Sequence, residues 1–109
     1  MSTHLPTLRQ LQYLIAVAEE GHFGRAAQRC FVTQSTLSAG IHELESILGI
    51  TVIERTKRRV AVTPLGLELV ARARRVLAEV EDMTVTAKAS TRPLTGLLRL
   101  GAIPTIGPY

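Results

Sequence analysis

The chain has 109 residues, of which 46% are hydrophobic and 20% are charged. A chain of this length and composition folds as one domain, or as one domain with a piece of another, and is not intrinsically disordered. The net charge of +4 favours an anionic polymer as a partner, whereas an aromatic content of 4%, without Trp, argues against single-strand binding through base stacking.

A first helix is predicted after a loose tail at residues 1–6. Thr7, followed three residues later by Gln10, fits the capping-box pattern that opens a helix, and Gly21 ends it. The apolar residues that recur on one face between these signals are Leu8, Leu11, Ile15 and Ala18. We expect this helix to pack across the two helices that follow and to support them.

Two further helices are predicted over roughly 23–31 and from the residue after Thr33 to Leu48, where Thr33 is the N-cap and Gly49 ends the second helix. The apolar residues of the second helix share one face because they are spaced by 4, 3 and 4 positions: Leu37, Ile41, Leu44 and Leu48. The junction contains no Gly, and we expect Val32 to fill the corner of the core. The pair is predicted to be a helix-turn-helix.

The opposite face of the second helix carries short hydrogen-bonding side chains and few charges, as a helix needs if it touches base edges in the major groove. The candidate DNA-contacting residues of this recognition helix are Thr33, Gln34, Ser35, Thr36, Ser38 and His42. Gln34 is the best candidate for a bidentate contact to adenine. Thr36 and Ser38 are candidates for shorter contacts to bases or phosphates.

Residues 51–62 are rich in β-branched side chains and predict a short two-stranded hairpin, the wing, with a basic tip. The candidate DNA-contacting residues of the wing are Arg55, Lys57, Arg58 and Arg59. A basic turn is ordinarily just solvated. Its position after a predicted recognition helix indicates contacts with phosphates or a minor groove instead.

A long helix is predicted from Pro64 to Ala89, because Thr63 followed by Pro is a strong helix start. The helix carries an apolar heptad seam that predicts a homodimer through residues 64–89 and half-sites about one DNA turn apart, or a multiple of it. The candidate dimerisation residues are Leu69, Ala73, Val76, Leu77, Val80, Met83 and Ala87. Packing of this seam inside the chain's own core is the alternative.

The last stretch, residues 90–109, contains a linker rich in Pro and Gly and then an alternating strand pattern ended by Pro104. A lone strand is not stable, so we expect the hinge and first strand of a truncated second domain. The predicted organisation is a winged helix-turn-helix at 1–63, a dimerisation helix at 64–89 and this opening of an effector-binding domain at 90–109.

Other chemistry is not indicated. Cys30 is the only cysteine, which excludes an intramolecular disulfide and fits a reducing compartment. His4, His22 and His42 lack the spacing of metal ligands, and neither a metal nor a cofactor is expected. Ser38 and His42 share a helical face, but no acid is placed to orient the histidine, so we do not expect an enzyme. Without a signal peptide or a membrane span, a cytoplasmic protein is expected.

Several stretches resemble the N-terminal part of the LysR-type transcriptional regulators and cover residues 8–66 almost continuously. They are Leu11-Gln-Tyr-Leu-Ile-Ala-Val-Ala, His22-Phe-Gly-Arg-Ala-Ala, Val32-Thr-Gln-Ser-Thr-Leu-Ser, Leu44-Glu-Ser-Ile-Leu-Gly, Glu54-Arg and Thr63-Pro-Leu-Gly. Within that family, residues 22–30 and 101–109 look most like the OxyR-type peroxide sensors. The resemblance implies a winged helix-turn-helix dimer, tetrameric when full length, that regulates transcription at pseudo-palindromic promoter sites, and the OxyR-type likeness implies an activator in oxidative stress.

The resemblance also bears on individual residues. By position, Gln34, Ser35, Ser38 and Arg58 match DNA-contacting places of the family. The family usually has Pro where this chain has Ser35. Many members carry longer polar or basic residues at the positions of Ala39, Gly40 and His42, which leaves the base preference open. The redox-active cysteines of peroxide sensors belong to a domain outside this chain, and Cys30 does not correspond to one of them.

The sequence therefore predicts a mainly α protein, with a three-helix core, a two-stranded wing and a long dimerisation helix, that binds double-stranded DNA sequence-specifically. Two alternatives remain: a protein-interaction module that dimerises through the heptad helix, and a winged helix that binds RNA.

Overall fold

The structure is a computed structural model that describes residues 4–55 and 60–91. The predictions for Lys57, Arg58 and Arg59 and for the strand within 92–109 lie outside the described residues. The chain divides into two compact units, residues 1–79 and residues 80–109, and each is described by itself. In the described ranges, no helix is both long and apolar enough to cross a membrane.

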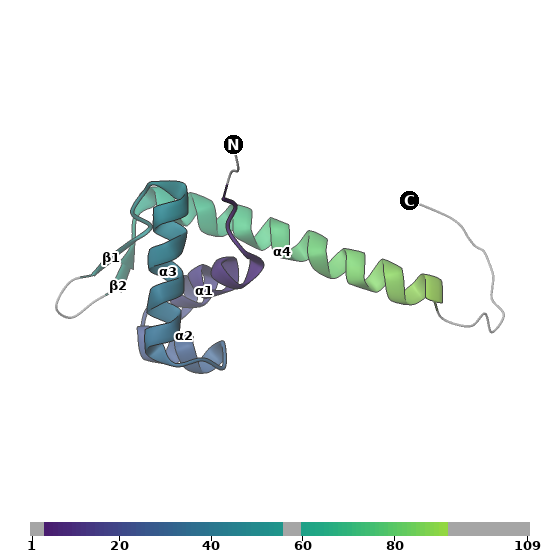
Figure 1. The fold of residues 1–109 in the computed structure, drawn as a ribbon, viewed down its shortest axis with the longest axis horizontal. Helices are drawn as coiled ribbons and strands as arrows, with labels where there is room; N and C mark the ends of the chain where they lie inside the picture. The colour runs from purple at the N-terminus through teal and green to yellow at the C-terminus, as the bar shows by residue number, and fades with distance from the viewer. Residues whose placement is uncertain (1–3, 56–59, 92–109) are drawn as a thin grey trace. The chain divides into compact units, whose positions relative to one another are not determined.

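The first unit contains three helices, a hairpin and the first part of a long helix (Figure 1). The helices are α1 (Leu8–Glu20), α2 (Phe23–Arg29) and α3 (Gln34–Leu48). The antiparallel hairpin pairs β1 (Ile53–Arg55) with β2 (Val60–Val62), with Ile53 opposite Val62. Helix α4 (Pro64–Thr91) begins directly after the hairpin. The predicted fold class, a winged helix-turn-helix of mainly helical structure, is confirmed.

The helix ends form where the local signals place them. Thr7 and Gln10 form the capping box of α1, with bonds of 3.1 Å from the Gln10 amide to the Thr7 hydroxyl and 3.0 Å from the Thr7 amide to the Gln10 side chain. Gly21 and Gly49 close α1 and α3 in the left-handed conformation, with φ of 65° and 70°. The Thr63 hydroxyl accepts the amide of Gly66 at 3.0 Å, as a cap of α4 does.

The junction between α2 and α3 departs from the prediction. Helix α2 ends at Arg29, two residues before the expected end, and Cys30 is its C-cap. The chain then turns through Phe31, which takes a left-handed φ of 59° although it is not glycine, and whose side chain is 94% exposed. Val32 is partly buried against the core, as expected. The tight turn is made by a strained phenylalanine, a conformation that costs about 1–3 kcal/mol.

The core of the first unit lies between α1 and α3 and is closed by α2, the hairpin and α4. Its largest fully buried side chains are Leu14, Val17, Leu37, Ile41, Leu44 and Val52. Gly66 sits where α4 meets the hairpin, and a Cβ at this position would lie 2.5 Å from the carbonyl oxygen of Val52. The glycine therefore allows the close approach that joins α4 to the helix-turn-helix.

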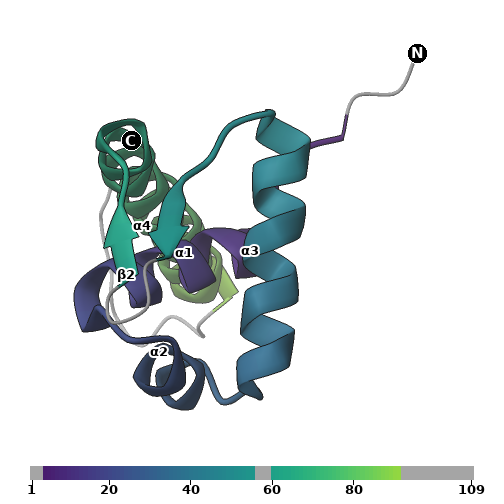
Figure 2. The ribbon, with the colours of Figure 1, turned by 90° about the vertical axis from the view of Figure 1, so that its left-hand side faces the viewer.

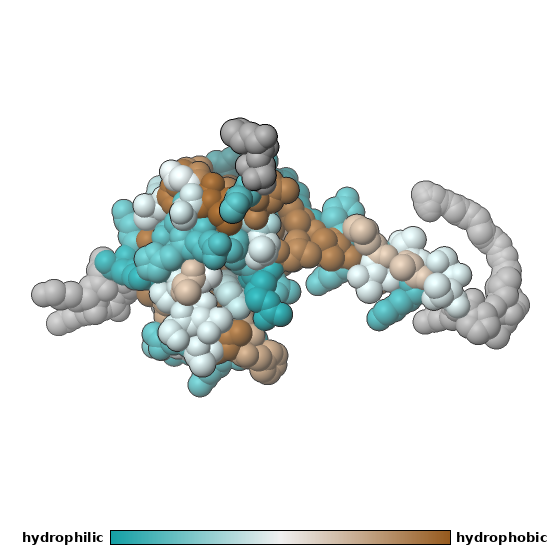
Figure 3. Space-filling model, in the orientation of Figure 1, coloured by the Kyte–Doolittle hydropathy of each residue, from teal (hydrophilic) through white to brown (hydrophobic). Residues whose placement is uncertain are grey.

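The seam of α4 is divided between core and surface. Ala73 is 2% exposed and packs in this chain's own core, with Leu69 and Leu77 partly buried against it. The burial of Ala73 fits the alternative in which this part of the seam packs inside the chain's own core, and the assignment of Ala73 to dimerisation stays a prediction. By contrast, Val76 is 43% and Met83 68% exposed. Figure 3 shows apolar surface over the first part of α4. The helix ends at Thr91, two residues later than predicted.

Candidate nucleic-acid interface

The polar face of α3 is open to solvent while its apolar face is buried. Figure 2 shows α3 at one side of the first unit. Of the candidate residues on this helix, Ser38 is half-buried and the following are exposed: Thr33, Gln34, Ser35, Thr36 and His42. Because Leu37, Ile41 and Leu44 are fully buried, the orientation of α3 is fixed by the core and leaves the candidate face free.

The start of α3 presents a cluster of hydroxyl groups at the positive end of a helix. The Thr33 hydroxyl accepts the Thr36 amide at 3.1 Å, donates to the Thr36 hydroxyl at 2.9 Å, and lies 3.2 Å from the Ser35 hydroxyl. No acidic residue occupies the first turn of α3. The free amides and the helix dipole at this end suit a phosphate oxygen. Three predicted contact residues are thus brought together and oriented before any ligand is bound.

Arg55 is the last residue of β1, paired with Val60 of β2, and contacts the recognition helix. One guanidinium nitrogen donates to the Ser38 hydroxyl at 3.2 Å, and the other lies 3.2 Å from Nε2 of His42. The guanidinium carbon is 4.6 Å from the centroid of the Phe23 ring, a cation–π distance. The sequence grouped Arg55 with three further cations of the wing, and the structure shows that the Arg55 side chain contacts α2 and α3.

Glu45 joins α3 to the wing, a role that the sequence reasoning missed. Its Oε2 accepts the backbone amides of Val52 and Ile53 at 2.9 and 3.1 Å, and its Oε1 lies 3.8 Å from Nδ1 of His42. The side chain is 18% exposed. The sequence marked Glu45 only as part of the stretch at residues 44–49 that resembles the family, and this gave no indication of its role.

Gly40 lies where α3 packs closely against α1. A Cβ at this position would lie 2.6 Å from the ring of Tyr13, which is 4% exposed on α1. The small residue is therefore explained by the close approach of α1 to α3. Ala39 is exposed on the same helix, and the base preference at Ala39 and Gly40 stays open.

Acidic residues at the end of α1 tie three helices together. Glu19 accepts hydrogen bonds from Arg74 of α4 at 2.8 Å and forms an ion pair of 2.6 Å with Arg29 of α2. These bonds from Arg74 and Arg29 lower the pKa of Glu19. These ion pairs connect the first part of α4 to α1 and α2, in addition to the packing of its apolar residues.

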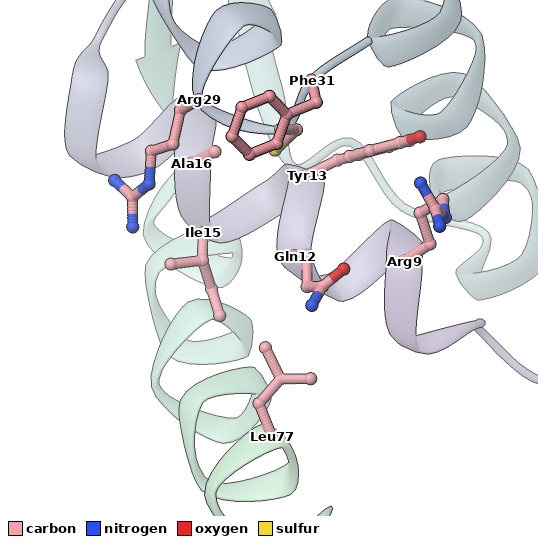
Figure 4. Close-up of a pocket in the computed structure, with 9 residues that line it drawn as sticks. Arg9, Gln12, Tyr13, Ile15, Ala16, Arg29, Phe31 and Leu77 are labelled. Atoms are coloured by element: carbon pink, nitrogen blue, oxygen red, sulfur yellow. The ribbon is translucent and has the colours of Figure 1, made fainter. Parts of the chain in front are cut away.

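A hollow of about 560 Å³ lies beside α1 (Figure 4). Its lining includes Ile15, Leu77 and the exposed Phe31, with Arg9 and Arg29 at its edges, and it includes none of the candidate DNA-contacting residues. Cys30 also lines it, and burial raises the pKa of its thiol, so it is less reactive than an exposed cysteine.

The sequence pattern of "Bacterial regulatory helix-turn-helix protein, lysR family" matches residues 8–67, which are α1 to the first turn of α4. The chain belongs to the LysR family. The match covers the candidate recognition helix and the wing, and it confirms the resemblance drawn from the sequence.

Among its LysR-family relatives, the "HTH-type transcriptional regulator EstR" of Acinetobacter baylyi is 53% identical over 96% of this chain and 35% of its own length. The "DNA-binding transcriptional dual regulator OxyR" of Escherichia coli is 47% identical over 94% of this chain and 33% of its own length. The chain thus spans about a third of these relatives, and its similarity to OxyR-type regulators is confirmed together with its similarity to EstR.

A solved structure of the LysR family shows the same fold in a DNA complex. The structure described as "CbnR_DBD-DNA complex" superposes with a TM-score of 0.75 at 35% identity, covering 79% of this chain and 99% of that one. The assignments of individual DNA-contacting and dimerisation residues in this chain stay predictions.

Proposed function

We propose that this chain binds double-stranded DNA sequence-specifically, as the DNA-binding part of a transcriptional regulator. The observation that carries the proposal is the exposed polar face of α3, which the buried Leu37, Ile41 and Leu44 hold outward next to the wing. A helix presented in this way fits a major groove and can reach base edges with short side chains. The similar fold of CbnR forms a complex with DNA, which supports DNA binding by this chain.

The test is selection of duplexes from a library with a random core, followed by titration of the selected duplex. If Gln34 contacts an adenine, replacing it by Ala should weaken binding to the selected duplex by about 1–3 kcal/mol. Binding to a scrambled duplex should not change. Gln12→Ala is the matched control, because Gln12 is exposed on α1 and outside the candidate face. Failure to enrich any duplex would remove the proposal.

The wing is assigned the phosphate or minor-groove contacts on the basis of its charge. Arg58→Ala should weaken binding to the selected and the scrambled duplex alike, and reduce the slope of log K against log salt by about 0.9 if Arg58 touches a phosphate. Competition with structured RNA separates duplex DNA from the RNA-binding alternative: preferential loss of the complex to RNA would favour that alternative.

The proposed active form is a homodimer through α4 that binds two half-sites of a pseudo-palindrome. Val76 and Met83 support it, because both are exposed residues of the seam. Met83→Asp should produce monomers in sedimentation and reduce affinity for the selected duplex. Val85→Asp is the matched control, since Val85 is 66% exposed but lies outside the seam. If Met83→Asp still forms a dimer, the prediction that the seam forms the dimer interface is wrong.

The finer biological role concerns the full-length parent. A cytoplasmic, non-enzymatic regulator that forms tetramers and activates genes under oxidative stress is the form of the proposal that the similarity to OxyR favours. Similarity to EstR keeps another signal open. Genomic footprinting and transcript measurements with and without hydrogen peroxide decide between them. A footprint and transcript levels that do not change with peroxide would indicate a different signal.

A further inference from the structure

Arg55 joins strand β1 of the wing to both helices of the helix-turn-helix. It is the last residue of β1, paired with Val60 of β2. Its guanidinium contacts Phe23 at the start of α2 and reaches Ser38 and His42 on α3. A planar guanidinium with several donors can serve all three partners at once, which an ammonium group cannot do.

The geometry on α3 allows one guanidinium to bridge two side chains. Ser38 and His42 are four residues apart, so they lie one above the other on the same helical face. The distances from Arg55 to the Ser38 oxygen and to Nε2 of His42 are both 3.2 Å. Arg55 therefore links the wing to the recognition helix through two candidate DNA-contacting residues, Ser38 and His42.

The link determines which hydrogen bonds Ser38 and His42 can offer. A hydroxyl that accepts from Arg55 keeps its own hydrogen to donate, so Ser38 suits acceptors such as purine N7 or a phosphate oxygen. An arginine can only donate, and therefore Nε2 of His42 must accept. The His42 proton then resides on Nδ1, the atom that lies 3.8 Å from Oε1 of Glu45.

We propose that Arg55 is a positioning residue that locks the wing to the recognition helix and orients Ser38 as a hydrogen-bond donor toward DNA. This inference rests on the proposed DNA binding and specifies how one of its contacts is set. The rival role for Arg55 is a direct phosphate contact, which would require it to leave Ser38, His42 and Phe23 when DNA binds. The two roles differ in their dependence on salt and on the shape of the cation.

The first experiment compares Arg55→Lys with wild type, using the duplex selected by the wild-type chain and a scrambled duplex. Lysine keeps the charge but loses the fork, so a positioning role predicts about tenfold weaker binding to the selected duplex, with the scrambled duplex and the salt slope unchanged. Arg75→Lys, at an exposed arginine of α4, is the matched control. Full binding by Arg55→Lys, with a slope reduced by about 0.9 in Arg55→Ala, would instead assign a phosphate contact and overturn the inference.

The second experiment is a double-mutant cycle between Arg55→Lys and Ser38→Ala. If Arg55 acts through Ser38, the double variant should bind the selected duplex about as well as Ser38→Ala alone. Additive losses would overturn the inference. Circular dichroism and urea unfolding of each variant identify any that fail to fold, and the Lys variant serves as the conservative replacement where Arg55→Ala is unstable.

Nitrogen NMR of His42 tests the link without DNA. The wild-type chain should show the neutral Nδ1–H tautomer, and Arg55→Lys should shift the ring toward the Nε2–H form. An Nε2–H tautomer in the wild type would overturn the inference, because Nε2 could not accept from Arg55. This readout distinguishes failure of the inference from failure of the proposed function, since it does not depend on any duplex being selected.

Discussion

Replacing Glu45 by Ala should detach the wing from the helix-turn-helix and lower the free energy of unfolding by about 2–6 kcal/mol, because two backbone amides lose their acceptor. One carboxylate oxygen accepts the amides of Val52 and Ile53 at 2.9 and 3.1 Å. Val52 is fully buried and Ile53 is 5% exposed, so these amides lose their partner without easy access to water. Each donor left unsatisfied costs about 1–3 kcal/mol.

Urea unfolding followed by circular dichroism measures this loss. Glu45→Gln keeps an acceptor oxygen and removes the charge, so its free energy of unfolding should lie between those of the wild type and Glu45→Ala. Glu43→Ala is the matched control, because Glu43 is exposed on the same helix, and it should stay within about 0.5 kcal/mol of wild type. A loss below about 1 kcal/mol in Glu45→Ala would show that water replaces the carboxylate and would refute the reasoning.

Two further predictions concern α1. Gly40→Ala should lower stability by about 1–2 kcal/mol, because the clash with Tyr13 at 2.6 Å outweighs the gain in helix propensity; a more stable variant by urea unfolding would contradict this. The hydrogen bonds from Arg74 and Arg29 depress the folded pKa of Glu19 below its usual value of 4.5, so their contribution to stability is present above that pH and is lost as the pH falls through the folded pKa. The stability difference between wild type and Glu19→Gln, under about 1 kcal/mol for so exposed a pair, should therefore vanish in urea titrations at acid pH, and a difference constant from neutral to low pH would refute it.

The helix boundaries were predictable because their signals are local. Thr7 and Gln10, or Thr33 and the residues it caps, are three positions apart, and the bond that each pair makes is nearly the same in any helix. The left-handed Phe31 was not predictable in this way. Glycine is the usual residue for such a conformation, and nothing local in the sequence marks this phenylalanine for it.

The contacts that shape the candidate interface were not predictable, because they join residues far apart in the chain. Gly40 and Tyr13 are 27 positions apart, from 40 − 13, and nothing local marks them as neighbours. The periodicity of α4 shows a related limit. A heptad pattern identifies an apolar face but not what covers it, so Ala73 and Met83 carried equal weight in the sequence although the first is buried in this chain and the second is exposed.

The position of Arg55 changes how the positive charge of the wing should be counted. If Arg55 is held by Ser38 and His42, the cations left for phosphates are Lys57, Arg58 and Arg59. Three phosphate contacts contribute about 2.7 to the slope of log K against log salt for each chain, whereas four would contribute about 3.6. The recognition face adds little to this slope because its side chains are short and mostly uncharged. Affinity should therefore depend on the wing and on dimerisation, and the choice of sequence on α3. A measured contribution of the wing to the salt slope nearer about 3.6 would indicate that Arg55 also contacts a phosphate.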